Sequence, residues 1–137
     1  INALSHSCSI FQPYHGTTLH KHCIKKGYID ANEMAENLTY ASPIRQNHIS
    51  KKEIEGMAKC FALYTKLPKS MYEFIRVAEQ DNDRGKKMYE ELTAIYKRVY
   101  APKAESDVGG GTRIIIDPNK FESKGVIDRL RQIQTSN

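Results

Sequence analysis

The sequence has no long apolar run. Its longest apolar stretches are residues 60–64 and 114–116, whereas a membrane-spanning helix needs about 20 consecutive apolar residues. The sequence therefore predicts no membrane span. It begins at Ile1 without an initiator methionine or a basic segment followed by an apolar one, so we expect no signal peptide. Because it opens directly into a strand-like segment, we expect a piece of a longer protein.

Cysteine is scarce. Only Cys8, Cys23 and Cys60 occur, an odd number with separations of 15 and 37 residues. This spacing is not that of a disulfide framework, and it lacks the close C-x-x-C pairs of a zinc site. We expect three reduced thiols in a cytoplasmic protein, with Cys8 buried as a small apolar residue in preference to a reactive thiol.

Clustered charge of one sign is also missing. The chain has 21 Lys and Arg residues against 16 Asp and Glu residues, a net charge of +5, and the excess is spread along the whole sequence. A nucleic-acid-binding surface usually shows clustered Lys and Arg. We therefore expect a solvated helical surface and no nucleic-acid partner.

Most catalytic motifs are absent. The glycines at 109–111 are not followed by the Lys-Ser/Thr of a P-loop, and no serine lies in a nucleophile-elbow motif. His20 and His22 point to different faces of a helix and cannot share a metal ion. We expect surface histidines, with His6 in a strand, and no metal ligand in this chain. The sequence assigns no catalytic residue.

Near the start of the sequence, small and larger side chains alternate with a period of two residues. Over residues 4–11, serines alternate with larger side chains, which predicts a strand. Pro13 ends it, because proline cannot donate to a central ladder. A turn follows, and Thr17 can cap a helix over residues 18–26 that Gly27 ends.

The remaining residues predict helices. S-x-x-E capping boxes open one helix at Ser50, ending before Pro68, and another over residues 70–79. A third runs to about Tyr100 and is closed by Pro102. The residues predicted to form the buried stripe of the first of these helices are Ile54, Met57, Ala58, Phe61 and Tyr64. Beyond a glycine hinge at 107–112 we expect a short strand over 113–117 and a final amphipathic helix.

These patterns predict a mainly α fold with a minor β component. Its three parts are residues 1–49, 50–100 and 101–137. The turn after the first strand is the best candidate for a functional site, because ligands of parallel α/β sheets bind beyond the carboxyl ends of the strands.

That turn reads F-Q-P-Y-H-G-T-T-L over residues 11–19, and G-Y-I follows the short basic helix at 27–29. The segment resembles the F-x-P-[YF]-P-G-T-x-L…G-[YWL]-[IL] segment of radical SAM enzymes, most of all those with an N-terminal cobalamin-binding domain. His15 stands where the family usually has proline. The resemblance covers about residues 3–100, including the helices that begin at Ser50.

The resemblance implies that residues 1–49 hold the last strand, turn and helix of a partial (β/α)₆ barrel, followed by a helical C-terminal region. It implies S-adenosylmethionine and a [4Fe–4S] cluster as cofactors, with cobalamin as a further cofactor of this class. The cluster reductively cleaves S-adenosylmethionine, and the adenosyl radical abstracts hydrogen from a small-molecule or cofactor-like substrate. This chain has no C-x-x-x-C-x-x-C triplet, so the cluster ligands are expected in the N-terminal remainder of the same protein.

The same resemblance implies site residues. Phe11, Gln12 and Tyr14 are the expected cofactor-binding residues, near the nucleoside of S-adenosylmethionine. The strand has two faces, and the sequence does not decide which is inward. The substrate-facing candidates are therefore either Ser5, Ser7 and Ser9 or His6 and Cys8.

Two functions are compatible with these patterns. The leading hypothesis is the C-terminal part of a radical SAM enzyme. The alternative is a non-catalytic helical protein-interaction module, in which residues 101–137 act as a docking tail.

Overall fold

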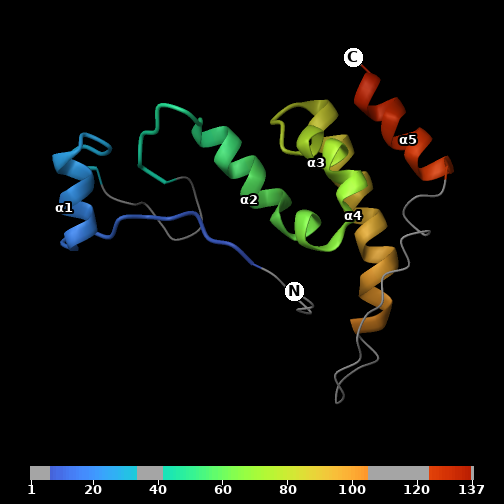
Figure 1. Cartoon of the computed structure of the whole chain (residues 1–137), viewed down its shortest axis with the longest axis horizontal. Coiled ribbons are helices and arrows are strands. Elements are labelled where there is room, and N and C mark those ends of the chain that lie inside the picture. Colours follow the sequence, from blue (N-terminus) through green and yellow to red (C-terminus); the bar gives the residue numbers. More distant parts are fainter. Residues whose placement is uncertain (1–6, 34–41, 105–123, 137) are drawn as a thin grey trace. The chain divides into compact units, whose positions relative to one another are not determined.

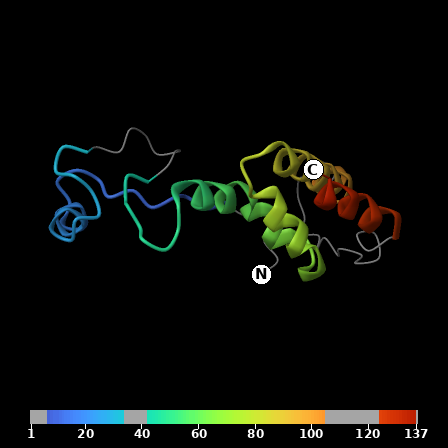
Figure 2. The same ribbon diagram turned by 90° about the horizontal axis from the view of Figure 1, so that it is seen from above.

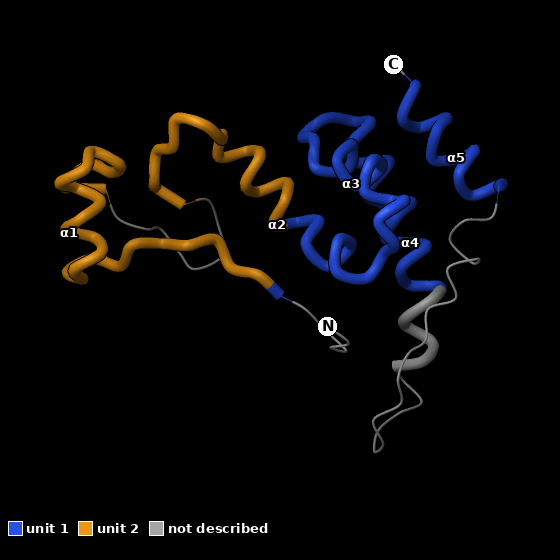
Figure 3. The backbone as a smooth tube through the Cα atoms, viewed as in Figure 1, with its two compact units in different colours: residues 1–7, 59–137 blue, residues 8–58 orange. Residues whose placement is uncertain are grey.

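The computed structural model describes residues 7–33, 42–104 and 124–136. The chain divides into two compact units, coloured in Figure 3. Unit 1 contains residues 1–7 and 59–137, and unit 2 contains residues 8–58. The predicted hinge at 107–112 and the predicted strand at 113–117 lie outside the described residues.

The described part of the chain is helical and contains no strand. Figure 1 shows its elements in chain order: α1 (Thr18–Lys25), α2 (Lys51–Lys66), the 3-10 helix η1 (Lys69–Met71), α3 (Tyr72–Ala78), α4 (Asp83–Ala104) and α5 (Lys124–Thr135). The mainly α prediction is therefore confirmed.

The strand predicted over residues 4–11 is wrong for its described part, which has no strand or helix assignment. A strand needs a neighbour for its backbone donors and acceptors. No backbone hydrogen bond joins Ser7–Phe11 to another described residue. Residues 4–6 lie outside the described ranges.

The start of α2 follows the predicted capping box. The backbone N–H of Ser50 donates to the Glu53 carboxylate (2.8 Å), and the N–H of Glu53 donates to the Ser50 hydroxyl (3.2 Å). The helix ends at Lys66, two residues before Pro68, as predicted. The helix predicted over residues 70–79 is divided in the structure: η1 covers Lys69–Met71, and α3 begins at Tyr72, with Met71 as its N-cap. Pro68, with extended backbone, starts the helical turn earlier than the motif predicts.

The predicted end of α4 is also wrong, because the helix continues through Pro102 to Ala104. A proline removes one backbone donor, and here that loss does not end the helix.

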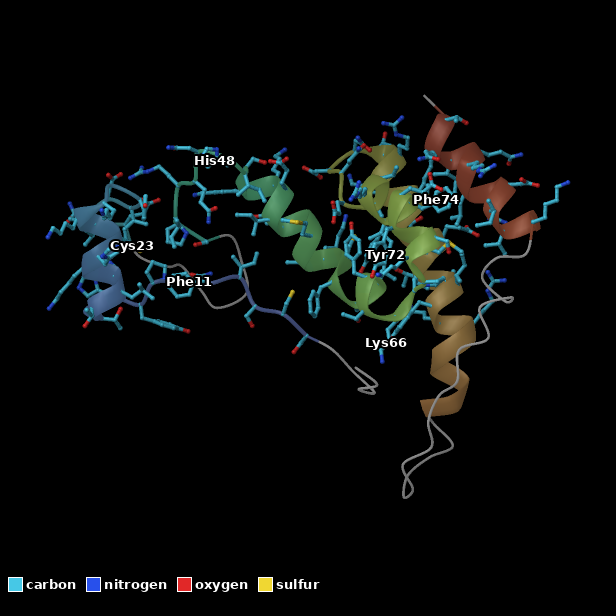
Figure 4. The ribbon with its side chains drawn as sticks, viewed as in Figure 1. Phe11, Cys23, His48, Lys66, Tyr72 and Phe74 are labelled. Atoms are coloured by element: carbon cyan, nitrogen blue, oxygen red, sulfur yellow. The ribbon has the colours of Figure 1, made fainter. Side chains whose placement is uncertain are left out.

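Unit 1 has a hydrophobic core supplied by all of its helices. Its buried members are Cys60, Leu63, Leu67, Met71, Phe74, Ile75, Val77, Ala78, Met88, Leu92, Ile95 and Leu130. Figure 4 labels Phe74 within this group of side chains. To this core α3 supplies Phe74, Ile75, Val77 and Ala78, and α4 supplies Met88, Leu92 and Ile95.

The stripe predicted for α2 is wrong in most of its members. The buried residues of this helix are Gly56, Cys60 and Leu63, followed by Leu67 just beyond its end. Met57 is 41% exposed and Phe61 only half-buried, whereas the predicted Tyr64 packs against the core. The packing surface of α3 and α4 decides which face of α2 is covered, and the spacing of the largest apolar residues does not reveal it.

The described residues of unit 2 form little core of their own. The buried hydrophobic residues among them are Cys23 and Ile29. All five large hydrophobic residues that the described chain exposes lie in this unit: Phe11, Tyr14, Leu19, Tyr28 and Met57.

Candidate functional site

The turn before α1 is built around the hydroxyl group of Thr17. This hydroxyl donates to the carbonyl of Tyr14 (2.7 Å) and accepts from the backbone N–H of His20 (3.2 Å). The N–H of Thr17 also donates to the Tyr14 carbonyl (3.2 Å). Thr17 is therefore the N-cap of α1, as predicted, and it also closes the turn that precedes the helix.

Gly16 lies between these groups with φ +81°. Residues with a Cβ rarely adopt this left-handed conformation, so glycine is the residue that this turn requires. The G-T pair of the motif therefore has a local physical reason: the glycine adopts the left-handed conformation of the turn, and the threonine hydroxyl stabilises the turn by hydrogen bonds.

The other end of α1 is closed by a Schellman motif. The N–H of Tyr28 donates to the carbonyl of Cys23 and that of Gly27 to the carbonyl of Ile24, both at 2.9 Å. Gly27 has φ +72°, the left-handed conformation that this cap uses. The chain then turns so that Ile29 is buried, only 2% exposed. The G-Y-I segment thus ends the helix and anchors the following residues.

An ion pair supports the segment after this cap. The guanidinium of Arg45 lies 2.8 Å from the carboxylate of Asp30, and the N–H of Arg45 donates to the carbonyl of Tyr28 at 2.8 Å. The hydrogen bond from Arg45, and then its charge, lower the pKa of Asp30. Both side chains are largely exposed, so the pair contributes little to stability.

The expected cofactor-binding residues are neighbours in sequence but differ in exposure. The side chains of Phe11 and Tyr14 are 51% and 56% exposed, whereas Gln12 is buried at 7%. Figure 4 shows Phe11 on the extended segment that precedes α1, and Cys23 on α1 itself. Two aromatic rings are therefore available to a ligand or a partner surface on this side of the turn.

The substrate-facing candidates are not gathered into a site. Ser7, Cys8 and Ser9 are all exposed, and His6 and Ser5 lie outside the described residues. The expectation that Cys8 is buried is wrong, because without a neighbouring strand the extended segment covers neither of its faces. The Cys8 thiol contacts the backbone carbonyl of Ala58 at 3.7 Å.

The sequence did not reveal the role of His20. We expected a surface histidine, but His20 is only 3% exposed. Its ring lies 4.9 Å from that of His15 between centroids, and its Nε2 atom is buried without a hydrogen-bond partner. The signal was the spacing of His20 and Cys23, three residues apart on one helix face, because Cys23 is buried as well.

The remaining polar features are separate from this turn. In unit 1, an open cavity of about 400 Å³ is lined by Asn82, Asp83, Arg84, Lys87 and Ser136, none of them a predicted site residue. Burial raises the pKa of the Cys60 thiol to about 11, so this thiol stays protonated and unreactive near neutral pH.

Within the described ranges, no group of three or more His, Cys, Asp or Glu side chains is placed to hold a metal ion. No helix there is long and apolar enough to cross a membrane. Comparison of the chain with protein families, with curated proteins and with solved structures finds no match.

Proposed function

We propose that this chain is the C-terminal part of a radical SAM enzyme. In the complete protein, an upstream [4Fe–4S] cluster reductively cleaves S-adenosylmethionine to start radical chemistry, and cobalamin is a further cofactor if the protein belongs to the class that it most resembles. The observation that carries the proposal is the agreement between the motif over residues 11–29 and its backbone. Both motif glycines have positive φ, at positions 16 and 27.

The chain's own residues do not fit the iron–sulfur cluster. Cys23 and Cys60 are buried, Cys8 is exposed, and their spacing gives no cluster motif. The cluster therefore belongs to another part of the protein in this proposal. What this chain contributes to S-adenosylmethionine is the turn with its exposed Phe11 and Tyr14 rings, which suit packing against a nucleoside.

The exposed apolar surface of unit 2 supports the proposal that this unit is part of a larger protein. Among its described residues, this unit exposes Phe11, Tyr14, Leu19 and Tyr28 and buries two hydrophobic residues. The backbone of Ser7–Phe11 has no hydrogen-bonded neighbour among the described residues. Extended backbone without hydrogen-bonded neighbours and exposed apolar surface of this kind are normally covered in a native protein. In the proposal, the preceding barrel covers them, and residues 4–11 become its last strand.

The first test is the coding sequence upstream of Ile1. We expect it to encode a C-x-x-x-C-x-x-C segment, and a complete upstream sequence without one would refute the proposal. The second test is anaerobic reconstitution of the complete protein with iron and sulfide. We expect the broad visible absorbance of an iron–sulfur cluster and cleavage of S-adenosylmethionine after reduction, with residues 1–137 alone as the negative control.

One observation favours the alternative, a helical protein-interaction module. The core of unit 1 is closed by helices of this chain alone. The alternative predicts that residues 1–137 bind a protein partner while the complete protein binds no cluster. Cluster binding by the complete protein would contradict it.

A further inference from the structure

Helix α5 supplies little of the buried core of unit 1. It packs against α3 and α4, as Figures 1 and 2 show. Of the twelve buried core residues, α5 supplies only Leu130, and the other eleven lie within residues 60–95. Val126, Ile127 and Ile133 are partly buried against the same core. Most of the buried core residues of unit 1 therefore lie outside α5.

The contacts of α5 are those of a helix docked on a preformed surface. Its apolar residues follow the i, i+1, i+4, i+7 spacing of one helix face. Two polar contacts flank this face: the Arg129 side chain lies 3.0 Å from the Glu91 carboxylate, and the Arg84 guanidinium donates to the Gln134 carbonyl at 3.3 Å. One contact is made in each half of α5, so the two together fix the position and direction of the helix.

The helical state of α5 depends on this docking. Isolated helices shorter than about 12–15 residues are marginal in water, and α5 has 12 residues with a glycine in its first turn. We propose that α5 is a detachable latch that folds when it docks, and that the α3–α4 face is a recognition surface for an amphipathic helix with the α5 pattern. The occupant of that surface is α5 of the same chain. This inference does not depend on the proposed radical SAM function.

A cleavable chain tests the latch. A sequence-specific protease site replaces Gly109–Gly111, and the cut protein is mixed with a labelled synthetic peptide of residues 124–136. We expect the cut protein to keep its α3–α4 core, and the peptide to exchange with the cut α5 segment and to bind saturably, one per chain. Unfolding or aggregation of the remaining chain when α5 leaves would overturn the proposal, because α5 would then be an integral part of the core.

Matched peptide variants test recognition. Leu130→Ala removes the fully buried side chain and should weaken binding by about 30-fold or more, the effect of truncating a core leucine. Arg129→Ala should weaken it by only about 2–5-fold, because that ion pair is largely exposed on the arginine side. Gln132→Ala, at an exposed position, is the control and should bind unchanged. Equal affinity of the Leu130→Ala and Gln132→Ala peptides, or no exchange of the cut segment, would contradict the latch.

Discussion

Two neighbouring residues, Gly16 and Thr17, fix the backbone conformation of the turn before α1. Gly16 has a left-handed backbone, and the neighbouring Thr17 hydroxyl makes hydrogen bonds on both sides of the turn. Both residues are exposed, and the described residues of unit 2 bury few hydrophobic side chains. The conformation of the turn therefore depends on the chemistry of these residues themselves.

We expect Gly16→Ala to destabilise the turn and the start of α1 by about 1–2 kcal/mol, because a Cβ is disfavoured in the left-handed region. The matched control is Gly125→Ala. Nothing lies within 4 Å of an added Cβ at either position, and positive φ occurs only at the first. The control should stabilise α5 by up to about 1 kcal/mol through higher helix propensity. Amide hydrogen exchange in α1 and α5 measures both effects, and an equal loss of protection in the two variants would refute the explanation.

Among the secondary-structure elements, α2 shows how much a local motif determines. The Ser50 and Glu53 side chains cap its first turn reciprocally. The hydrogen bonds from Ser50 also lower the pKa of Glu53 below its ordinary value of 4.5. A carboxylate with a lowered pKa stabilises the folded state above its unfolded pKa, and this contribution is lost as the pH falls through the folded pKa.

We expect Ser50→Ala to cost about 1 kcal/mol at the start of α2, the usual effect of losing a side-chain cap. The pKa of Glu53 should rise toward 4.5 in this variant. As the pH falls, the first turn of α2 should therefore begin to fray at a higher pH than in the unchanged chain. An NMR pH titration of the Glu53 carboxyl group measures the shift. Glu55→Gln, on the exposed side of the same helix, is the control and should leave the first turn intact. An unchanged Glu53 titration in Ser50→Ala would contradict the capping account.

Local signals placed α1 and the start of α2, but they misplaced the start of α3, the end of α4 and the buried face of α2. Thr17, Gly27 and Ser50 act through backbone atoms a few residues away, so the sequence was sufficient to place α1 and the start of α2. The buried face of α2 is set by α3 and α4, and the burial of His20 is set by the fold of unit 2. These depend on distant residues that no local pattern contains. For the same reason, the strand predicted over residues 4–11 is wrong in its described part: the alternation is local, whereas a strand needs a neighbour that no local pattern contains.

Across the whole molecule, stability is expected to be uneven. Among the described residues, unit 1 has twelve buried hydrophobic residues in one cluster, and unit 2 has Cys23 and Ile29. Regions with few buried apolar residues open locally at a lower free energy than the core. The two units should therefore differ in how readily their backbone amides meet solvent.

We expect the amides of α1 to exchange about 100-fold or more faster than those of α3 and α4 in residues 1–137. In the complete protein, α1 should become protected, because the proposed barrel would cover the apolar surface of unit 2. Hydrogen exchange followed by mass spectrometry compares both samples, with α3 as the internal reference. Protection of α1 equal to that of α3 in the short chain would show that unit 2 needs no cover.

The two hydrogen bonds of the Thr17 side chain restrict which residues can replace it. Its oxygen is a donor toward the Tyr14 carbonyl and an acceptor from the His20 N–H. An ionised aspartate, otherwise among the best N-caps, accepts but cannot donate, and its charge would face the carbonyl oxygen. Serine keeps both functions, and valine, which has nearly the same shape, keeps neither. Phosphorylation at this position would replace the donor with acceptor oxygens and open the turn.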